Sequence, residues 1–265
     1  MKDLRISMVQ AATVWHDAEA NRTLYGNLVR PLAGATDLVV LPETFTSGFS
    51  NDAAELAEGT DGPSLAWLRA LAADTGAVVT GSVVIRDGAG VYNRLIWMRP
   101  DGSHLHYDKR HLFRMAREHE RYAPGCDRVL VELAGWQVCP VVCYDLRFPV
   151  FLRNRFDAAA GRFDYDLMVC VANWPAPRAY AWRTLLRARA IENLACVVGV
   201  NRVGLDGNQI PYDGDSVVLD ALGQPLIELG REPQVVTATL PAAPLIAHRQ
   251  RFPAQLDADS FDLRP

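Results

Sequence analysis

Short apolar runs, separated by polar stretches, recur along the whole chain. Runs of this length that are rich in valine, isoleucine and leucine are typical of β-strands buried on both faces. We predict such strands near residues 4–9, 38–41, 77–84, 92–98, 136–142, 167–171, 196–200, 216–219 and 235–239.

Other segments have apolar residues at every third or fourth position, which is the spacing of an amphipathic helix. We predict helices over residues 17–32, 64–74 and 179–193. Ser64, directly after Pro63, is a suitable helix start, and Gly76 is a suitable stop. Asp-Gly pairs, which favour hairpin turns, stand at 101–102 and 206–207. The alternation of strands and helices predicts a layered α/β fold.

The composition fits a globular protein with a large core. The chain has 265 residues, of which 49% are hydrophobic, and this length suits one large domain, although it would also allow two. The formal net charge is −4, and acidic and basic residues are interspersed, which argues against a nucleic-acid-binding surface. Even the arginine-rich stretch 110–128 is balanced by Glu118, Glu120 and Asp127.

Nothing in the sequence indicates a membrane, an oxidising compartment or a metal. No apolar run approaches the roughly 18–20 residues that cross a bilayer, and the N-terminus lacks the apolar stretch of a signal peptide, so we expect a cytoplasmic location. The five cysteines form no pairing pattern, as expected for free thiols. Cys-x-x-Cys and His-x-x-x-His spacings are absent, and we predict neither a metal site nor a cofactor.

Cys143 stands where one of the predicted strands ends. The apolar run 136–142 leads into it, and a polar, proline-containing segment follows at 144–149. The end of a strand is where an α/β sheet usually opens onto its active site, and a thiol there is nucleophilic if a base lies nearby. Taken alone, Cys143 would be interpreted as a core residue, because free cysteine is among the most buried residue types.

Two charged residues stand in comparable places. Glu43 follows an apolar run and a proline, which cannot donate to a sheet ladder and so marks the end of a strand. Lys109 follows a short β-type run at 105–108, and the apolar residues 112–113 would bury its surroundings. A single glutamate or lysine of this kind is usually a solvated surface charge. Their combination with Cys143 is what points to a site.

These three residues, in this order and context, resemble the site of the nitrilase superfamily of carbon–nitrogen hydrolases. Glu43 stands in Leu-Pro-Glu, Lys109 in Tyr-Asp-Lys-Arg-His-Leu-Phe and Cys143 in Val-Cys-Tyr-Asp-Leu-Arg-Phe-Pro, at separations typical of that family. The likeness continues through segments 6–10, 92–93, 122–125, 172–175, 187–193, 201–204 and 212–216. It implies a four-layer αββα sandwich of two sheets and a single carbon–nitrogen hydrolase domain over residues 1–265.

The chemistry of amide hydrolysis explains the three residues. An amide carbonyl is a poor electrophile and ammonia is a poor leaving group, so two covalent steps are easier than one. The resemblance implies that Cys143 is the nucleophile, Glu43 the general base and Lys109 the charge that stabilises the oxyanion. The backbone N–H of Tyr144, which follows the nucleophile in a turn, is the expected second oxyanion donor.

A fourth site residue is expected in the segment before Gly125. In the proteins that this chain resembles, a second glutamate lies seven residues before the glycine of a Pro-Gly pair, which points to Glu118 here. Glu120 is the competing choice, and both could instead lie in a solvated loop. The expected role of this glutamate is to orient Lys109 and to bind the amide nitrogen of the substrate.

Substrate-binding residues are expected after the predicted strand at 167–171. Asn173 and Trp174 would face the mouth of the site near Cys143, although Trp174 could equally be a structural plug. Arg183 stands on the following predicted helix, roughly one turn beyond that loop. From there it could reach a carboxylate of the substrate.

The blocks around Lys109 and Cys143 most resemble the bacterial ω-amidases, which hydrolyse the terminal amide of 2-oxo dicarboxylic acid monoamides such as 2-oxoglutaramate. One departure is Val150, where many relatives carry an acidic residue, so Arg147 is assigned only a structural role. Within the same chemistry, the alternative is an N-carbamoyl hydrolase or another short-chain aliphatic amidase, and a nitrile hydrolase is less favoured. A non-catalytic scaffold or binding protein on the same fold is the alternative from a different class.

The resemblance also implies a homodimer. In proteins of this kind, the predicted helix 179–193 and the segment after the nucleophile pack across a two-fold axis. Residues 246–253 resemble the stretch that crosses onto the partner subunit in such proteins, and the C-terminal tail, about residues 240–265, is expected at the dimer interface. Arg187 and Glu192 are expected to pair within the helix or at that interface. Apart from a second copy, a small-molecule amide is the expected partner.

Overall fold

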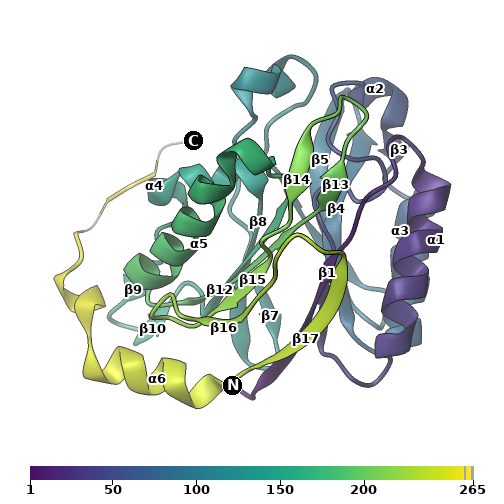
Figure 1. Ribbon diagram of the computed structural model, residues 1–265. Helices are drawn as coiled ribbons and strands as arrows, with labels where there is room; N and C mark the ends of the chain where they lie inside the picture. Colours follow the sequence, from purple (N-terminus) through teal and green to yellow (C-terminus); the bar gives the residue numbers. More distant parts are fainter. Residues whose placement is uncertain (260, 264–265) are drawn as a thin grey trace.

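Two β-sheets lie face to face in the computed structural model, which describes residues 1–259 and 261–263 (Figure 1). The seven-stranded first sheet has the order β17 (Gln234–Leu240), β1 (Leu4–Gln10), β2 (Leu38–Val40), β4 (Val78–Asp87), β5 (Gly90–Met98) and β6 (His104–Asp108), with β3 (Glu58–Gly59) beside β4. The six-stranded second sheet has the order β16 (Pro225–Glu228), β15 (Val217–Leu219), β12 (Cys196–Asn201), β11 (Leu167–Ala172), β8 (Trp136–Val142) and β7 (Val131–Leu133).

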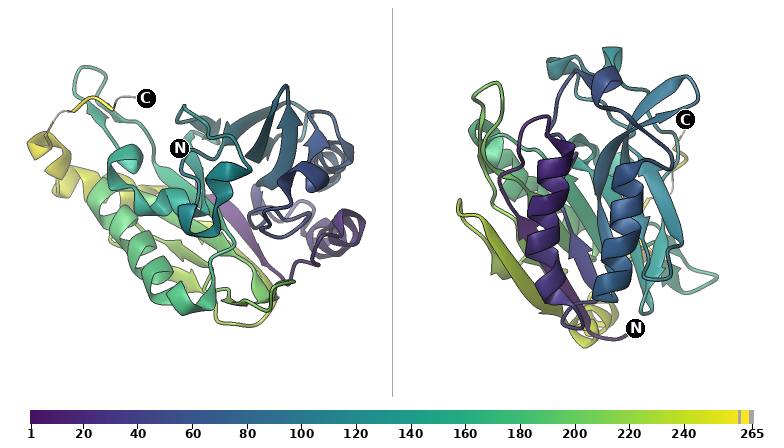
Figure 2. Two further views of the ribbon diagram at one scale, coloured as in Figure 1. Left: turned by 90° about the horizontal axis from the view of Figure 1, so that it is seen from above. Right: turned by 90° about the vertical axis from the view of Figure 1, so that its right-hand side faces the viewer.

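Helices cover the outer faces of both sheets, as Figures 1 and 2 show. On the first sheet these are α1 (Ala18–Val29) and α3 (Pro63–Thr75), and on the second sheet α5 (Ala179–Asn193). The other helices are α2 (Ala53–Leu56), α4 (Pro149–Leu152) and α6 (Ala242–Arg251), which follows the last strand. The order of layers is helix, sheet, sheet, helix, and it confirms the predicted αββα sandwich.

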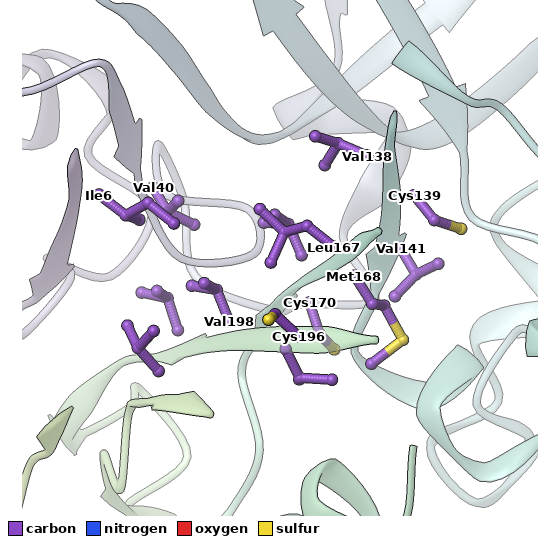
Figure 3. Packing of buried hydrophobic residues seen from close by; sticks show 14 of the residues in the cluster. Ile6, Val40, Val138, Cys139, Val141, Leu167, Met168, Cys170, Cys196 and Val198 are labelled. Atoms are coloured by element: carbon purple, nitrogen blue, oxygen red, sulfur yellow. The ribbon is translucent and has the colours of Figure 1, made fainter. Parts of the chain in front are cut away.

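The alternation of side chains along the strands gives the first sheet a core on each face. On β1, Leu4, Ile6 and Met8 pack into the core between the sheets, whereas Val9 packs against the outer helices. Figure 3 shows part of the central core, to which Ile6 and Leu167 contribute from opposite sheets. Strand β11 is buried at every position because both faces of its sheet are covered, which explains its continuous apolar run.

Every strand predicted from the sequence is present, and no end differs by more than three residues. The predicted helices are present as well. Asp17 caps α1, because its carboxylate accepts the N–H of Ala20 at 2.9 Å. Helix α3 begins at Pro63, one residue before the predicted start, and ends at Gly76, which adopts a left-handed φ of 68°. Turn and cap chemistry was therefore a reliable guide to these boundaries.

Several short elements are not predicted by the sequence patterns. They are β3, β7, β9 (Phe156–Asp157), β10 (Arg162–Phe163), β13 (Val203–Leu205), β14 (Pro211–Asp213), β16 and helices α2, α4 and α6. The strands among them have two to four residues, which is too few to establish a period of two. Both Asp-Gly pairs do mark hairpins, between β5 and β6 and between β13 and β14. Within the described residues, no helix combines the length and the apolar composition needed to cross a bilayer.

Strand direction brings the predicted site residues to one edge of the structure. Strands β1, β2 and β4 are parallel, and β6 runs in the same direction because β5 is antiparallel to both of its neighbours. Glu43 and Lys109 therefore follow the carboxyl ends of β2 and β6 on the same edge of the first sheet. In the second sheet, parallel β8 and β11 end just before Cys143 and Asn173.

A glycine on β4 sets the path of the segment that carries Glu43. A Cβ at Gly81 would lie 2.8 Å from the Cβ of Leu41 and 3.0 Å from the ring of Phe45. We expect Gly81→Ala to lower the free energy of unfolding by about 1–3 kcal/mol, because the packed segment must shift. Urea unfolding followed by circular dichroism measures the effect. Gly59→Ala is the matched control, since a Cβ at that position would meet no atom within 4 Å, and equal stabilities of the two variants would contradict this packing argument.

Candidate active site

The nucleophile candidate stands at a strained turn. Cys143 directly follows β8 and begins a short 3₁₀ helix, Cys143–Arg147. Its φ of 45° lies in the left-handed region, which is uncommon for a residue with a side chain. Such strain is found where the surrounding structure holds a functional group in place. The side chain is 9% exposed and lines a cavity.

A buried aspartate holds this turn against the strand end that carries Lys109. Asp145 accepts the backbone N–H of Val142 at 3.0 Å, inside the turn. The same carboxylate accepts the hydroxyl of Tyr107 at 2.8 Å and the backbone N–H of His111 at 3.0 Å. Tyr107 lies in β6 and His111 lies two residues after Lys109. Asp145 thereby fixes the position of the thiol relative to the ammonium group.

Glu43 is fully buried and makes three hydrogen bonds through its carboxylate. Oε1 accepts from Nζ of Lys109 at 2.9 Å and from Nδ2 of Asn93 at 2.8 Å. Oε2 accepts the backbone N–H of Asn173 at 2.7 Å, which joins the first sheet to the second. These donors fix the orientation of the carboxylate beside Cys143.

Lys109 lies between two buried carboxylates. Its Nζ donates to Glu43 at 2.9 Å and to both oxygens of Glu118, at 3.0 and 3.1 Å. Burial alone would lower the pKa of Lys109, but Glu118 and Glu43 together raise it well above its ordinary value. Burial raises the pKa of Glu118, an effect that the charge of Lys109 opposes. Glu118 thus lies beside Lys109, whereas the competing Glu120 is exposed and pairs with Arg117.

The surroundings of Cys143 favour the protonated thiol over the thiolate. Burial raises the pKa of Cys143 well above its ordinary value, and the charge of Glu43 raises it further, while Lys109 acts in the opposite direction. The thiol itself donates to the backbone oxygen of Asn173 at 3.9 Å. Attack by sulfur therefore requires a base, and Glu43 is the group placed to accept the proton.

A cavity of about 150 Å³ opens beside Cys143. Its wall combines the catalytic candidates with aromatic, amide and guanidinium groups: Glu43, Phe49, Ser50, Asn51, Lys109, Phe113, Ala116, Cys143, Tyr144, Arg147, Asn173, Trp174, Pro175, Arg178, Asp206, Asn208, Ile210 and Tyr212. Such a small, partly apolar cavity suits a small-molecule substrate.

Of the predicted substrate-binding residues, Asn173 and Trp174 line this cavity and Arg183 does not. Asn173 also supports the base, since its Nδ2 donates to the backbone oxygen of Glu43 at 2.7 Å. The guanidinium of Arg183 pairs with Asp215 at 3.0 Å, so the structure does not bring it to the cavity. Arg147, to which the sequence assigns only a structural role, does line the cavity, and its guanidinium lies 4.8 Å from the ring centre of Trp174.

Residues whose role depends on distant partners were not predicted from the sequence. Asn93 is a polar residue within an apolar strand, and this break in the pattern could have indicated its contact with Glu43. Arg178 and Tyr212 reach the cavity from other segments of the chain, and no local pattern identifies them. Glu192 pairs within the helix with Arg189, as expected. Arg187 instead pairs with Glu228, which lies on β16 of the same chain and not on the helix.

Comparison with known proteins agrees with this geometry. A family model described as carbon–nitrogen hydrolase matches residues 5–250. The omega-amidase YafV of Yersinia enterocolitica is 48% identical over 98% of this chain and 99% of its own length, and the 2-oxoglutaramate amidase of Bacillus subtilis is 34% identical over 77% and 78%.

Among solved structures, a carbon–nitrogen hydrolase superfamily protein from Xanthomonas campestris, with an arsenic adduct in its active site, is 62% identical. It superposes with a TM-score of 0.98, and the match covers 100% of both chains. The chain described here belongs to the carbon–nitrogen hydrolase family.

Proposed function

We propose that this protein hydrolyses the terminal amide of a 2-oxo dicarboxylic acid monoamide, such as 2-oxoglutaramate, to a carboxylate and ammonia. The observation that carries the chemistry is the meeting of Cys143, Glu43 and Lys109 at one small cavity. The substrate class is supported by the names of the relatives, an omega-amidase and a 2-oxoglutaramate amidase, which match this chain over most of its length.

The first half of the reaction forms a thioester. Sγ of Cys143 attacks the amide carbon, and Glu43 takes the thiol proton as the C–S bond forms. The carbonyl oxygen becomes an oxyanion, which the ammonium of Lys109 and the backbone N–H of Tyr144 stabilise. When this tetrahedral species collapses, the C–N bond breaks, Glu43 returns the proton to nitrogen, and ammonia leaves.

The second half releases the acid. Glu43 removes a proton from water, and the resulting hydroxide attacks the thioester carbon to give a second oxyanion at the same place. Its collapse breaks the C–S bond, and the sulfur recovers the proton from Glu43. Each cycle consumes one water and returns the thiol and the carboxylate to their starting states, so no cofactor is required.

Glu118 acts through Lys109 rather than on the substrate. It does not line the cavity, and its two oxygens hold the ammonium that stabilises the oxyanion. We therefore assign it a positioning role. The alternative substrates, N-carbamoyl amino acids and short aliphatic amides, would use the same three groups and differ only in what the cavity wall must bind.

A homodimer and a cytoplasmic location are part of the same proposal. Apolar side chains are exposed on α5, such as Tyr180 and Ile191, and after α6, such as Leu256, which is the kind of surface that a second subunit covers. Residues 260 and 264–265 of the tail lie outside the described part of the chain. All five cysteines are free, in keeping with a reducing compartment.

Replacement of the nucleophile tests the function directly. We expect the wild-type protein to release ammonia faster from 2-oxoglutaramate than from N-carbamoyl amino acids or butyramide, and Cys143→Ala to abolish this release without changing the circular dichroism spectrum. Cys126→Ala, which removes an exposed thiol outside the cavity, is the control and should be fully active. Hydroxylamine should trap the acyl group as a hydroxamate in the wild type and the control, but not in Cys143→Ala. Ammonia release by Cys143→Ala near the wild-type rate would reject the proposed nucleophile.

The base is tested through the pH dependence of the thiol. Glu43 raises the pKa of Cys143, so Glu43→Gln should lower that pKa and shift the alkylation of the thiol by iodoacetamide to lower pH. Hydrolysis should be lost in the same variant because no group can take the proton. Mass spectrometry of the alkylated protein and an ammonia assay measure the two effects. An unchanged alkylation profile, or retained hydrolysis, would show that Glu43 is not the base.

The choice between the two glutamates is tested by a matched pair of variants. Glu118→Gln should lower kcat by at least about tenfold, which corresponds to about 1.4 kcal/mol of barrier, because the ammonium of Lys109 is no longer held in position by both oxygens of Glu118. Glu120→Gln alters only an exposed pair with Arg117 and should keep the wild-type kcat. Steady-state ammonia release gives both values. Equal effects in the two variants would contradict the assignment of Glu118.

A further inference from the structure

Two guanidinium groups on the cavity wall have no acidic partner. Arg147 and Arg178 both line the cavity and are half-buried. Within the described part of the chain, no carboxylate forms an ion pair with either of them. Their guanidinium groups contact aromatic faces instead, Trp174 at 4.8 Å for Arg147 and Phe113 at 5.2 Å for Arg178.

The other charged groups of the cavity wall have hydrogen-bond partners of their own. Lys109 lies between Glu43 and Glu118. The carboxylate of Asp206 is occupied within its own hairpin, where it accepts the backbone N–H groups of Asn208 and Ile210 and the hydroxyl of Tyr212. Arg147 and Arg178 are therefore the basic groups of the cavity wall that form no ion pair within the described residues.

The arginines on the neighbouring helix α5 are paired, in contrast to the two on the cavity wall. Arginines on α5 each have a carboxylate within 3.0 Å, as in the pairs Arg183–Asp215, Arg187–Glu228 and Arg189–Glu192. A guanidinium group without such a partner is suited to binding the carboxylate of a ligand, because its planar N–H donors match the two carboxylate oxygens.

Trp174 positions both arginines. Its ring lies under the guanidinium of Arg147, and its indole N–H donates to the backbone oxygen of Arg178 at 2.8 Å. The backbone of Trp174 is held in turn by Asn201, whose Oδ1 accepts its N–H at 2.8 Å. Arg147 lies in the 3₁₀ helix that begins at the nucleophile, so the distance from the thiol to this cationic wall is set by the fold.

We propose that Arg147 and Arg178 together bind the carboxylate of the substrate at the end opposite the reacting amide. This inference rests on the proposed function and names the residues that select the substrate for that reaction. The pair favours an amide that carries a distal carboxylate over a neutral amide. It also disfavours an amino-acid amide such as glutamine, because the α-ammonium would stand beside two uncompensated cations. A 2-oxo group in that position carries no such charge.

The test compares a charged and a neutral substrate in single variants. Arg147→Gln and Arg178→Gln remove one guanidinium each, and the backbone oxygen that holds Trp174 remains. We expect kcat/KM for 2-oxoglutaramate to fall about 10- to 100-fold in each variant, mainly through KM, because a hydrogen-bonded charge is lost. Pentanamide, which has the same carbon chain and no charge, should lose far less. In both variants the ratio of kcat/KM for 2-oxoglutaramate to kcat/KM for glutamine should also decrease.

Arg183→Gln is the matched control, because the guanidinium of Arg183 pairs with Asp215 outside the cavity. In this variant the ratio of kcat/KM for 2-oxoglutaramate to kcat/KM for pentanamide should stay at the wild-type value. The paired subsite is overturned if Arg147→Gln or Arg178→Gln keeps the wild-type ratio of kcat/KM for 2-oxoglutaramate to kcat/KM for pentanamide. That outcome includes an equal loss of kcat/KM for both substrates.

A second measurement does not depend on turnover. The rates at which iodoacetate and iodoacetamide alkylate Cys143 compare an anionic with a neutral reagent of similar size. The relative rate of iodoacetate should fall in both cavity variants and stay unchanged in Arg183→Gln. A wild-type protein that is inactive on 2-oxoglutaramate would reject the proposed function, and the alkylation ratio would still decide whether the two arginines attract a carboxylate.

Discussion

The contact of one buried ammonium with two buried carboxylates is the interaction on which the site depends. Nζ of Lys109 lies 2.9 Å from Glu43 and 3.0 Å from Glu118, and these side chains are at most 1% exposed. Removing one partner from such a group leaves a buried charge uncompensated, which typically costs about 3–5 kcal/mol. The backbone N–H of Asn173 also donates to Glu43, and that of Phe113 donates to Glu118. Segments of both sheets are thus held at one edge by one network of buried charges and backbone donors.

The same network couples proton transfer to charge stabilisation. Burial, and after it the charge of Glu43, keep the pKa of Cys143 well above its ordinary value, although Lys109 acts in the opposite direction. When Glu43 accepts the thiol proton it becomes neutral, and Lys109 is left with Glu118 as its only charged partner in the network. Its positive charge is then less compensated at the moment when the oxyanion forms. The arrangement needs no resting thiolate, because the proton transfer that activates sulfur also makes Lys109 a stronger electrostatic stabiliser.

The layered α/β fold could be predicted from local features, whereas the family resemblance specified the two-sheet sandwich and singled out the three central residues. Continuous apolar runs give the strands, and a glutamate, a lysine and a cysteine follow three of those runs. The supporting contacts could not be predicted, since they join residues that are distant in sequence, as Asp145 joins Tyr107 and His111. Arg183 was assigned to the substrate for the same reason: nothing near it in the sequence reveals Asp215 as its partner.

Two consecutive residues after β11 connect the catalytic part of the site to its cationic wall. Asn173 donates its backbone N–H to Glu43. The ring of Trp174 contacts the guanidinium of Arg147, and its indole N–H donates to the backbone oxygen of Arg178. The register of β11 against β8 and β12 fixes where this pair stands. A shift of one residue would remove the donor from the base and the aromatic ring from the arginine at once. Chemistry and specificity are therefore positioned by the same strand end, and neither can be moved independently of the other.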